Sequence, residues 1–223
     1  MNASPGAARP GLTVRDDTDA SSGAVLQYRL ITGRSEAFRA EKLQAIGAAR
    51  RRILDIGRGA RHDESLFAGS EYRVVSIDPG DRPDFLHDLC TMDAIVPAAA
   101  FDVVLCIAVL EHVYDPFRAI GQVWRALEPG GLFFGYVPFL YGYHAASTYR
   151  DYYRYTEQGL AYLLREFTEI EIATVRGNLS TLANLLPGRL ARVQTLLRPF
   201  DRFFSFRQVS GYYFFARKPL TIE

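Results

Sequence analysis

The 223-residue chain has few cysteines, almost no lysine and no long apolar run. Its two cysteines, Cys90 and Cys106, exclude a disulfide framework, and no spacing among its cysteines and histidines predicts a metal site. No apolar run approaches the ~20 residues that a membrane-spanning helix needs. Because 26 Lys+Arg stand against 25 Asp+Glu, the net charge is only +1, and we expect no bulk attraction to nucleic acid.

The composition is typical of one globular domain. Overall, 48% of the residues are hydrophobic and 23% are charged. Residues 1–23 are rich in Ala, Ser, Pro, Gly and Asp and lack the apolar core of a signal peptide, so we expect a disordered leader. Residues 24–223 are predicted to form a single domain, and we expect a soluble protein of the cytoplasm.

Short apolar segments alternate with helical patterns. The predicted strands are residues 52–56, 72–77, 84–86, 102–107, 131–137, 169–175 and 209–216. Helices are predicted over 35–50 with Ser35 as N-cap, after Asp115-Pro116, and from the N-cap Thr156 to Phe167. This alternation favours a Rossmann-like α/β fold: a doubly wound, mostly parallel sheet of seven strands whose last two strands form an antiparallel edge pair.

A leucine-rich segment separates the last two predicted strands. Residues 178–206 predict a helical insertion broken at Pro187 and Pro199, with arginines opposite the leucines. We expect a packed helical hairpin, and a lid, a dimer contact and a membrane-surface helix are the alternatives.

The first predicted strand runs directly into a glycine turn, ILDIGRG at 53–59. Gly57 and Gly59 let the backbone approach a ligand at the carboxyl edge of the sheet. Asp78 ends the second strand, where a carboxylate can accept hydrogen bonds from a ribose diol. Together these signals predict an adenosine-containing ligand. Asp55 favours S-adenosylmethionine over a dinucleotide, because its carboxylate would repel a pyrophosphate and attract an ammonium and a sulfonium.

Five motifs then follow one another in an order that resembles class I S-adenosylmethionine-dependent methyltransferases. They are ILDIGRG at 53–59, SID at 76–78, HDL at 87–89, FDVVLCIAVLEHV at 101–113 and LEPGG at 127–131. The resemblance covers about residues 35–137 and implies S-adenosylmethionine as methyl donor, S-adenosylhomocysteine as product, and no metal. More weakly, RDYYRYT at 150–156 resembles a segment of small-molecule and glycan methyltransferases.

The resemblance also implies which residues bind the cofactor. They are Asp55, Gly57, Arg58, Gly59, Asp78, Pro79, Asp88, Leu89, Ile107 and Ala108. Asp88 would accept from the adenine amino group, and its alternative role is a turn cap. Arg58 and Arg61 depart from the family's usual turn, since two cations beside a sulfonium oppose binding unless one binds the methionine carboxylate. This departure keeps open a cofactor-binding protein without transfer activity.

Aromatic residues concentrate where an acceptor would enter. Ten Phe or Tyr lie between residues 133 and 155, and we expect 138–156 to be the substrate side. The predicted acceptor-binding residues are Phe139, Tyr141, Tyr143, Asp151, Tyr152 and Arg154. Asp151 and Arg154 pair with each other in the alternative interpretation. His144 and His112 are the candidate general bases, because histidine titrates near neutrality.

The sequence therefore predicts an S-adenosylmethionine-dependent methyltransferase that acts on an oxygen or nitrogen atom of a small molecule, with no nucleic-acid partner. One alternative is a pseudoenzyme or partner subunit that binds the cofactor without transferring its methyl group. Another is a lipid or glycolipid methyltransferase whose segment 178–206 contacts a membrane. The oligomeric state is left open.

Overall fold

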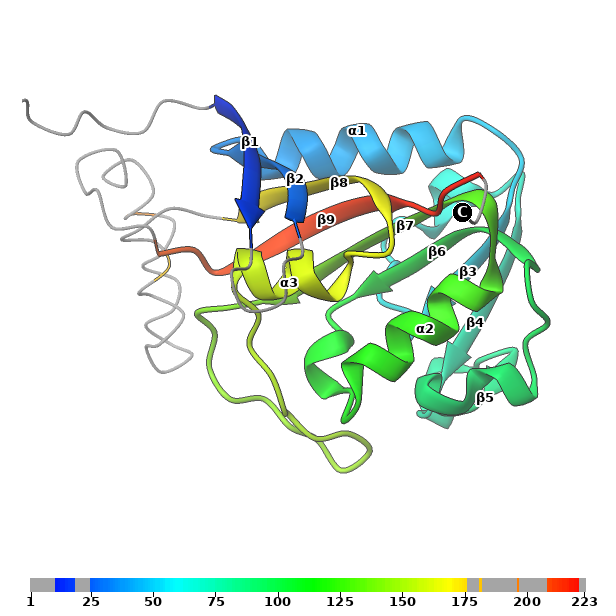
Figure 1. Ribbon diagram of the computed structural model, residues 1–223. Helices are drawn as coiled ribbons and strands as arrows, with labels where there is room; N and C mark the ends of the chain where they lie inside the picture. The colour runs from blue at the N-terminus through cyan, green and yellow to red at the C-terminus, as the bar shows by residue number, and fades with distance from the viewer. Residues whose placement is uncertain (1–10, 19–24, 176–180, 182–195, 197–207, 221–223) are drawn as a thin grey trace, which may run out of the picture.

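The computed structural model describes residues 11–18, 25–175, 181, 196 and 208–220. Within this part of the chain, one nine-stranded sheet forms the centre of the molecule (Figure 1), in the order β1-β2-β8-β9-β7-β6-β3-β4-β5. The strands are β1 (Gly11–Thr18), β2 (Val25–Thr32), β3 (Arg52–Ile56), β4 (Glu71–Ser76), β5 (Phe85–Leu86), β6 (Phe101–Ile107), β7 (Leu127–Pro138), β8 (Thr168–Val175) and β9 (Gly211–Arg217). The helices are α1 (Ser35–Gly47), α2 (Pro116–Ala126) and α3 (Glu157–Leu163).

The direction of the strand order changes at β3. This strand pairs in parallel with β4 on one side and with β6 on the other. The β6–β7, β4–β5 and β2–β8 pairs are also parallel, whereas β9 runs antiparallel between β7 and β8. At such a switch point the connections leave the carboxyl ends of neighbouring strands in opposite directions, which opens a crevice suited to a ligand.

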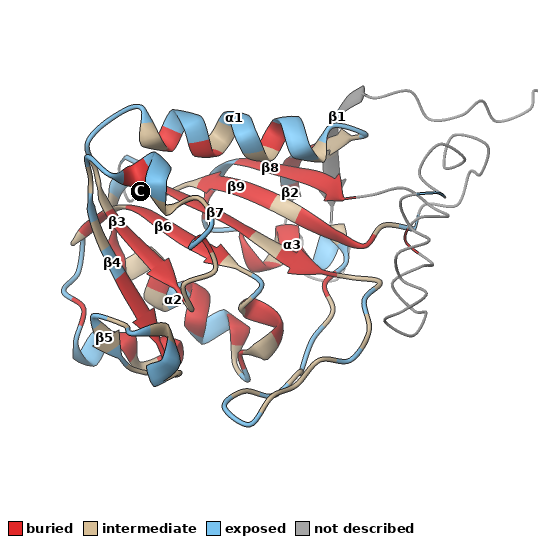
Figure 2. Ribbon diagram, turned by 180° about the vertical axis from the view of Figure 1, so that it is seen from behind, coloured by how far each residue is buried: buried red, intermediate tan, exposed pale blue. Residues whose placement is uncertain are grey.

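Helices cover both faces of the sheet, so the core has two halves. On one face α1 packs through Phe38, Leu43 and Ile46. On the other face lie α2 and α3, and Ile120 and Val123 are among the residues that α2 buries there. Successive residues of β6 belong alternately to the two clusters, as the two-residue period of a strand requires. The central strands are accordingly buried along most of their length (Figure 2).

Two of the three predicted N-caps are confirmed. The Asp115 carboxylate accepts the N–H of Arg118 at 3.0 Å, and the Thr156 hydroxyl accepts the N–H of Gly159 at 3.1 Å. The prediction of Ser35 as an N-cap is wrong, because the cap position of α1 is Arg34, whose side chain makes no capping bond. The helices α1 and α3 also end earlier than predicted, at Gly47 and Leu163.

All seven predicted strands are present, but the sheet has two more. In β2 the side chains of Leu26, Tyr28 and Leu30 are buried and alternate with exposed residues. Because β2 pairs with β8, the antiparallel pair β8–β9 lies inside the sheet and not at its edge, which corrects the prediction. The strand β1 lies within the expected leader 1–23, where Gly11–Thr18 pairs with β2 over its whole length and satisfies the backbone groups of β2.

The predicted helical insertion at 178–206 lies outside the described residues, apart from Thr181 and Leu196. In the part of the chain that the structure describes, no helix combines the length and the apolar character needed to cross a bilayer.

Candidate active site

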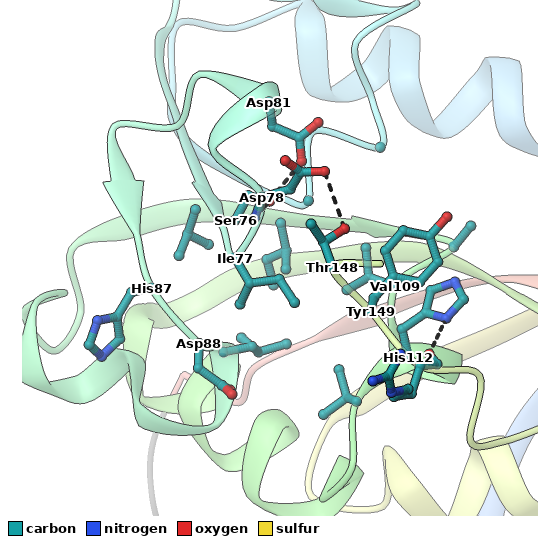
Figure 3. Close-up of a pocket in the computed structure, with 18 of the residues that line it drawn as sticks. Ser76, Ile77, Asp78, Asp81, His87, Asp88, Val109, His112, Thr148 and Tyr149 are labelled. Carbon is teal, nitrogen blue, oxygen red and sulfur yellow. Dashed lines mark hydrogen bonds between the residues drawn. The ribbon is translucent and has the colours of Figure 1, made fainter. Parts of the chain in front are cut away.

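A cavity of about 650 Å³ lies at the carboxyl ends of β3, β4 and β6. Its walls come from the turn after β3, the connections after β4 and β5, the residues after β6, and the loop 139–155 that follows β7 (Figure 3). Nine residues that the sequence predicted for the site line it: Gly57, Gly59, Asp78, Asp88, Leu89, Ile107, Ala108, His112 and Tyr152. The structure thus brings most of the predicted cofactor residues to one cavity, while their individual roles stay predictions.

The glycine turn packs tightly against the end of β6. Gly57 has a φ of +67°, in the left-handed region that favours glycine. A Cβ atom on Gly59 would lie 2.3 Å from the carbonyl oxygen of Ile107 and 2.9 Å from its Cβ. Only glycine fits here without displacing the backbone, and this contact brings the turn to the cavity wall.

Asp55 supports this turn from within the core and does not line the cavity. Its side chain is fully buried on the α1 face, because residues two apart on β3 share a face and Ile53 packs there. Asp55 Oδ2 accepts the N–H of Ala60 at 3.1 Å and the hydroxyl of Tyr72 at 2.5 Å. Burial raises the pKa of Asp55 to about 7. The structure therefore places Asp55 behind the turn and outside the cavity wall, and its predicted role toward the cofactor stays a prediction.

Asp78 and Asp88 lie on neighbouring connections and cap short 3₁₀ turns. Asp78 Oδ1 accepts the N–H of Gly80 at 2.8 Å, at the start of the turn Pro79–Asp81. Asp88 Oδ1 accepts the N–H of Cys90 at 2.7 Å, and its carboxylate borders the cavity (Figure 3). Each bond uses one oxygen of the carboxylate, so capping is compatible with accepting a further hydrogen bond from a ligand. Pro79 itself lies outside the wall.

The two arginines of the turn have different surroundings. The Arg58 guanidinium donates to the carbonyl oxygen of Asp81 at 2.9 Å and pairs with Glu64 at 3.4 Å, and the residue is not part of the cavity wall. Arg61, by contrast, lines the cavity. Of these two arginines, Arg61 is therefore the one placed to meet an anionic group of a ligand.

The loop 139–155 is held together by an internal ion pair. Arg154 Nη2 donates to Asp151 Oδ2 at 2.7 Å and to the carbonyl oxygen of Gly142 at 3.0 Å. The same Asp151 oxygen accepts the N–H of His144 at 2.9 Å. The hydrogen bond from Arg154 lowers the pKa of Asp151, whose side chain is only 2% exposed. Asp151 and Arg154 thus form a latch within the loop, which is the alternative that the sequence left open.

The other predicted acceptor residues are dispersed. Tyr152 lines the cavity, whereas Phe139 packs against the core with its ring 6.2 Å from that of Tyr212. Tyr141 and Tyr143 are 46% and 80% exposed and lie outside the wall. The loop contributes instead four consecutive residues that sequence reasoning did not select: Ser147, Thr148, Tyr149 and Arg150.

His112 and His144 lie beside each other, with ring centroids 4.9 Å apart. Only His112 lines the cavity, with its ring 4.3 Å from that of Tyr149. Burial lowers the pKa of His112. The Nε2 atoms of His112 and His144 lie 3.8 and 3.7 Å from Oε1 of Glu111, respectively.

Sequence reasoning did not select Glu111 as a functional residue. Its side chain is fully buried, and neither carboxylate oxygen has a hydrogen-bond partner within the described part of the chain. Burial raises the pKa of Glu111 to about 7. The sequence does contain a signal for Glu111, because its carboxylate stands between apolar residues, Leu110 and Val113, that are buried in the structure. Burying an ionisable side chain costs free energy, so a carboxylate in an apolar run indicates a functional or paired group.

Solved structures with this fold include S-adenosylmethionine-dependent methyltransferases. One from Archaeoglobus fulgidus aligns with a TM-score of 0.55 at 17% identity, over 82% of this chain and 94% of its own. Phosphoethanolamine N-methyltransferase 2 of Haemonchus contortus, solved with S-adenosyl-L-methionine, aligns with a TM-score of 0.53 at 18% identity, over 82% of this chain and 52% of its own. The [4+2]-cyclase SpnF aligns with a TM-score of 0.52 at 18% identity, over 82% of each chain. The likeness defines the class of fold, a Rossmann-like methyltransferase fold.

The sequence identifies the family within that class. A family profile described as a methyltransferase domain matches residues 26–169, so the chain belongs to that family of class I S-adenosylmethionine-dependent methyltransferases. Ubiquinone biosynthesis O-methyltransferases are similar over part of their length. The enzyme of Pseudomonas fluorescens is 32% identical over 106 residues, which cover 41% of this chain and 46% of the relative. The enzyme of Paramagnetospirillum magneticum is 31% identical over 96 residues, which cover 37% of this chain and 39% of the relative. The match thus spans less than half of these curated relatives.

Proposed function

We propose that this protein transfers the methyl group of S-adenosylmethionine to an oxygen or nitrogen atom of a small molecule. The observation that carries the proposal is the pair Asp78 and Asp88 on neighbouring walls of one cavity. A ribose diol and an adenine amino group present hydrogen-bond donors, which carboxylates accept. Family membership supports this ligand. The hydrogen bond from the Ala60 N–H to Asp55 also supports this ligand over a dinucleotide, because it occupies a turn amide that could otherwise bind a phosphate.

The acceptor would bind between the sulfonium and the loop 139–155. Tyr149, Tyr152 and His112 line that side of the cavity, and aromatic walls suit a flat or apolar acceptor. In the transfer, an acceptor lone pair attacks the methyl carbon, and the C–S bond breaks with its electron pair moving to sulfur. S-adenosylhomocysteine leaves, and the acceptor proton passes to a base or to water. The names of the curated relatives and of the Haemonchus enzyme support oxygen and nitrogen acceptors.

The alternative of cofactor binding without transfer rests on Arg58 and Arg61. Because Arg58 is bonded to Asp81 and Glu64 outside the cavity wall, only one of these two cations opposes the sulfonium. The lipid or glycolipid alternative depends on the segment 178–206, which lies outside the described residues. We therefore favour transfer to a small molecule.

Isothermal titration calorimetry with S-adenosylmethionine, S-adenosylhomocysteine and NAD⁺ tests the ligand. We expect the first two to bind and NAD⁺ not to bind. Asp78→Ala should weaken S-adenosylhomocysteine binding by about 1–3 kcal/mol, or roughly 5–150-fold, through lost hydrogen bonds to the ribose. The exposed Asp93 provides the control variant Asp93→Asn, which should leave the dissociation constant unchanged. Tight NAD⁺ binding, or an unchanged constant in Asp78→Ala, would contradict the assignment.

Transfer itself is tested with methyl-labelled S-adenosylmethionine and a panel of phenols, amines and sugars. Label in an organic product, dependent on the intact protein and absent without acceptor, supports the proposal. Cofactor binding with no transfer to any class in the panel would favour the pseudoenzyme alternative.

A further inference from the structure

Glu111, His112 and His144 bring possible metal ligands together beside the cavity. One ligand atom of each residue lies within 4.8 Å of those of the other two. In both His112 and His144, Nε2 is the ring nitrogen nearest to Glu111 Oε1. We propose that Glu111, His112 and His144 form a binding site for one divalent first-row transition-metal ion, of the type that Zn²⁺ and Co²⁺ occupy. A ligand set of two imidazoles and one carboxylate binds such ions in preference to Mg²⁺ or Ca²⁺, which favour oxygen ligands alone.

The hydrogen bonds on the far sides of the rings support metal binding. His112 Nδ1 lies 2.7 Å from the carbonyl oxygen of Arg150, and His144 Nδ1 lies 3.0 Å from that of Gly142. A carbonyl oxygen can only accept, so His112 Nδ1 carries the hydrogen and its neutral ring presents the Nε2 lone pair. The same tautomer is favoured for His144, because the Gly142 carbonyl oxygen is nearer to its Nδ1 than the Arg154 guanidinium, which lies at 3.5 Å. This is the usual orientation of metal-binding histidines, whose other nitrogen donates to a carbonyl or carboxylate.

Without a cation, the arrangement would bring lone pairs toward a carboxylate. Both Nε2 atoms face Glu111 Oε1, at 3.8 and 3.7 Å. Neither oxygen of this fully buried side chain has a hydrogen-bond partner in the described part of the chain. A buried, unpaired carboxylate is costly, and a divalent ion would compensate its charge and both lone pairs at once.

The two separations from Glu111 fit an ion after a small contraction, and the ligand atoms of the two histidines, which lie within 4.8 Å of each other, would also move together on binding. Ligand atoms ~2.0–2.2 Å from a tetrahedral Zn²⁺ lie roughly 3.3–3.5 Å apart. The two Nε2–Oε1 distances exceed that range by a few tenths of an ångström. Three protein ligands leave the fourth position open, as in catalytic zinc sites.

The charge of Arg154 beside His144 is largely balanced. Arg154 Nη2 lies 3.5 Å from His144 Nδ1, on the side of the ring away from Nε2. The same guanidinium pairs with Asp151 through both of its Nη atoms. The latch therefore adds little net charge to the site, and it holds the His144 backbone in place through the N–H bond to Asp151.

The site is open to solvent on one side and adjoins the cavity on the other. The His144 side chain is 32% exposed, which provides an entry path, and His112 lines the cavity. Only the use of the ion rests on the proposed function: bound next to the acceptor, it would lower the pKa of an acceptor hydroxyl. Spacing rules missed the site because Glu111 and His112 are adjacent in sequence while His144 is 32 residues further along.

Titration of chelator-treated protein with Co²⁺ and Zn²⁺, without S-adenosylmethionine, tests the site. We expect one Co²⁺ per chain with the visible absorption bands of four- or five-coordinate Co²⁺, and displacement of these bands by Zn²⁺. Glu111→Gln, His112→Ala and His144→Ala should each weaken binding by about 100-fold or more. The chain has only two other histidines, so His62→Ala and His87→Ala are matched controls that should bind as the wild type does.

Glu111→Gln and His112→Ala alter buried or half-buried residues, so His144→Ala, at a more exposed position, keeps the test decisive if they fail to fold. Absence of a Co²⁺ spectrum up to millimolar ion, or equal binding by wild type and His144→Ala, would overturn the proposal and indicate a proton shared between Glu111 and a histidine. Loss of binding in His62→Ala alone would indicate a surface site and would also overturn it. Calorimetry with S-adenosylhomocysteine is a separate readout, so failure of the cofactor assignment is distinguishable from failure of the metal site.

Discussion

The Thr148 hydroxyl donates a hydrogen bond of 3.4 Å to Oδ2 of Asp78, which lies 70 residues earlier in the chain. The bond joins the loop 139–155 to the connection after β4 across the cavity (Figure 3). Asp78 Oδ1 already accepts the N–H of Gly80. A ribose hydroxyl that binds Oδ2 would therefore compete with Thr148.

Thr148→Val should tighten S-adenosylhomocysteine binding modestly. The variant keeps the side-chain shape and removes the competing donor, so we expect the dissociation constant to fall by about 2–5-fold, equivalent to a net hydrogen bond of about 0.5–1 kcal/mol. Calorimetry measures the change. Asp93→Asn, at an exposed position outside the cavity wall, serves again as the control. Weaker binding in Thr148→Val would instead show that the hydroxyl contacts the ligand.

Gly59→Ala should destabilise the protein and weaken cofactor binding. The added methyl would lie 2.3 Å from the Ile107 carbonyl oxygen, so either the turn or the end of β6 must move, at a cost of about 1–3 kcal/mol. Urea denaturation and calorimetry with S-adenosylhomocysteine measure the two effects. Gly69→Ala is the matched control, because no atom lies within 4 Å of its Cβ position. Equal stability of the two variants would be inconsistent with the tight contact.

Arg154→Ala should destabilise the loop 139–155 by leaving a buried carboxylate unpaired. The Asp151 side chain is 2% exposed, and removing its partner should lower the free energy of unfolding by about 2–4 kcal/mol. Urea denaturation, together with hydrogen exchange of the His144 amide, measures the effect. Arg73 pairs with Glu71 and Asp84 at the surface, so Arg73→Ala should change stability little. A similar small effect of Arg154→Ala would exclude the latch.

Asp55 should make stability fall as pH rises toward neutrality. Its pKa is about 7 in the folded protein against an ordinary value of 3.8, mainly because burial disfavours the charged form. Between these values the folded state binds more protons than the unfolded state. The contribution of Asp55 is therefore fully present below about pH 4, declines by at most about 1.4 kcal/mol per pH unit, and is lost above about pH 7.

The matched variant is Asp55→Asn, which cannot titrate. The free energy of unfolding of the wild type minus that of Asp55→Asn should decrease from pH 4 to pH 7 and then level off, as measured by urea denaturation at fixed ionic strength. Parallel curves for the two proteins across this range would contradict the raised pKa.

Much of the sheet was predictable because its strands are short apolar runs bounded by turn residues. The seven predicted strands appear with bounds shifted by no more than four residues. The strand β2 was missed although Leu26, Tyr28 and Leu30 alternate in the strand pattern. Its place beside β8, which moves the antiparallel pair away from the edge, depends on pairing between residues about 140 apart, and no local pattern specifies that pairing.

The cofactor side of the cavity was predictable because its residues directly follow strand ends that meet at one edge of a parallel sheet. Gly57, Asp78 and Asp88 reach the cavity in this way. Asp55 lies outside the cavity wall although it closely precedes the turn, because its side chain is on the α1 face of β3. The acceptor side was less predictable, since a loop without regular structure follows β7 and only Tyr152 of six predicted residues lines the cavity.

The amino-acid sequence alone determined the order of strands and turns, the helix caps at Asp115 and Thr156, and the carboxylates at the strand ends, because these depend on neighbouring residues and on the two-residue and 3.6-residue periods. Only the tertiary structure decided that Arg58 turns away from the cavity and that Thr148 reaches Asp78. The tertiary structure alone also decided that His144 lies beside Glu111. These relationships arise from contacts between groups that are distant in sequence, and such contacts form only when the strand connections and the loop 139–155 have packed together.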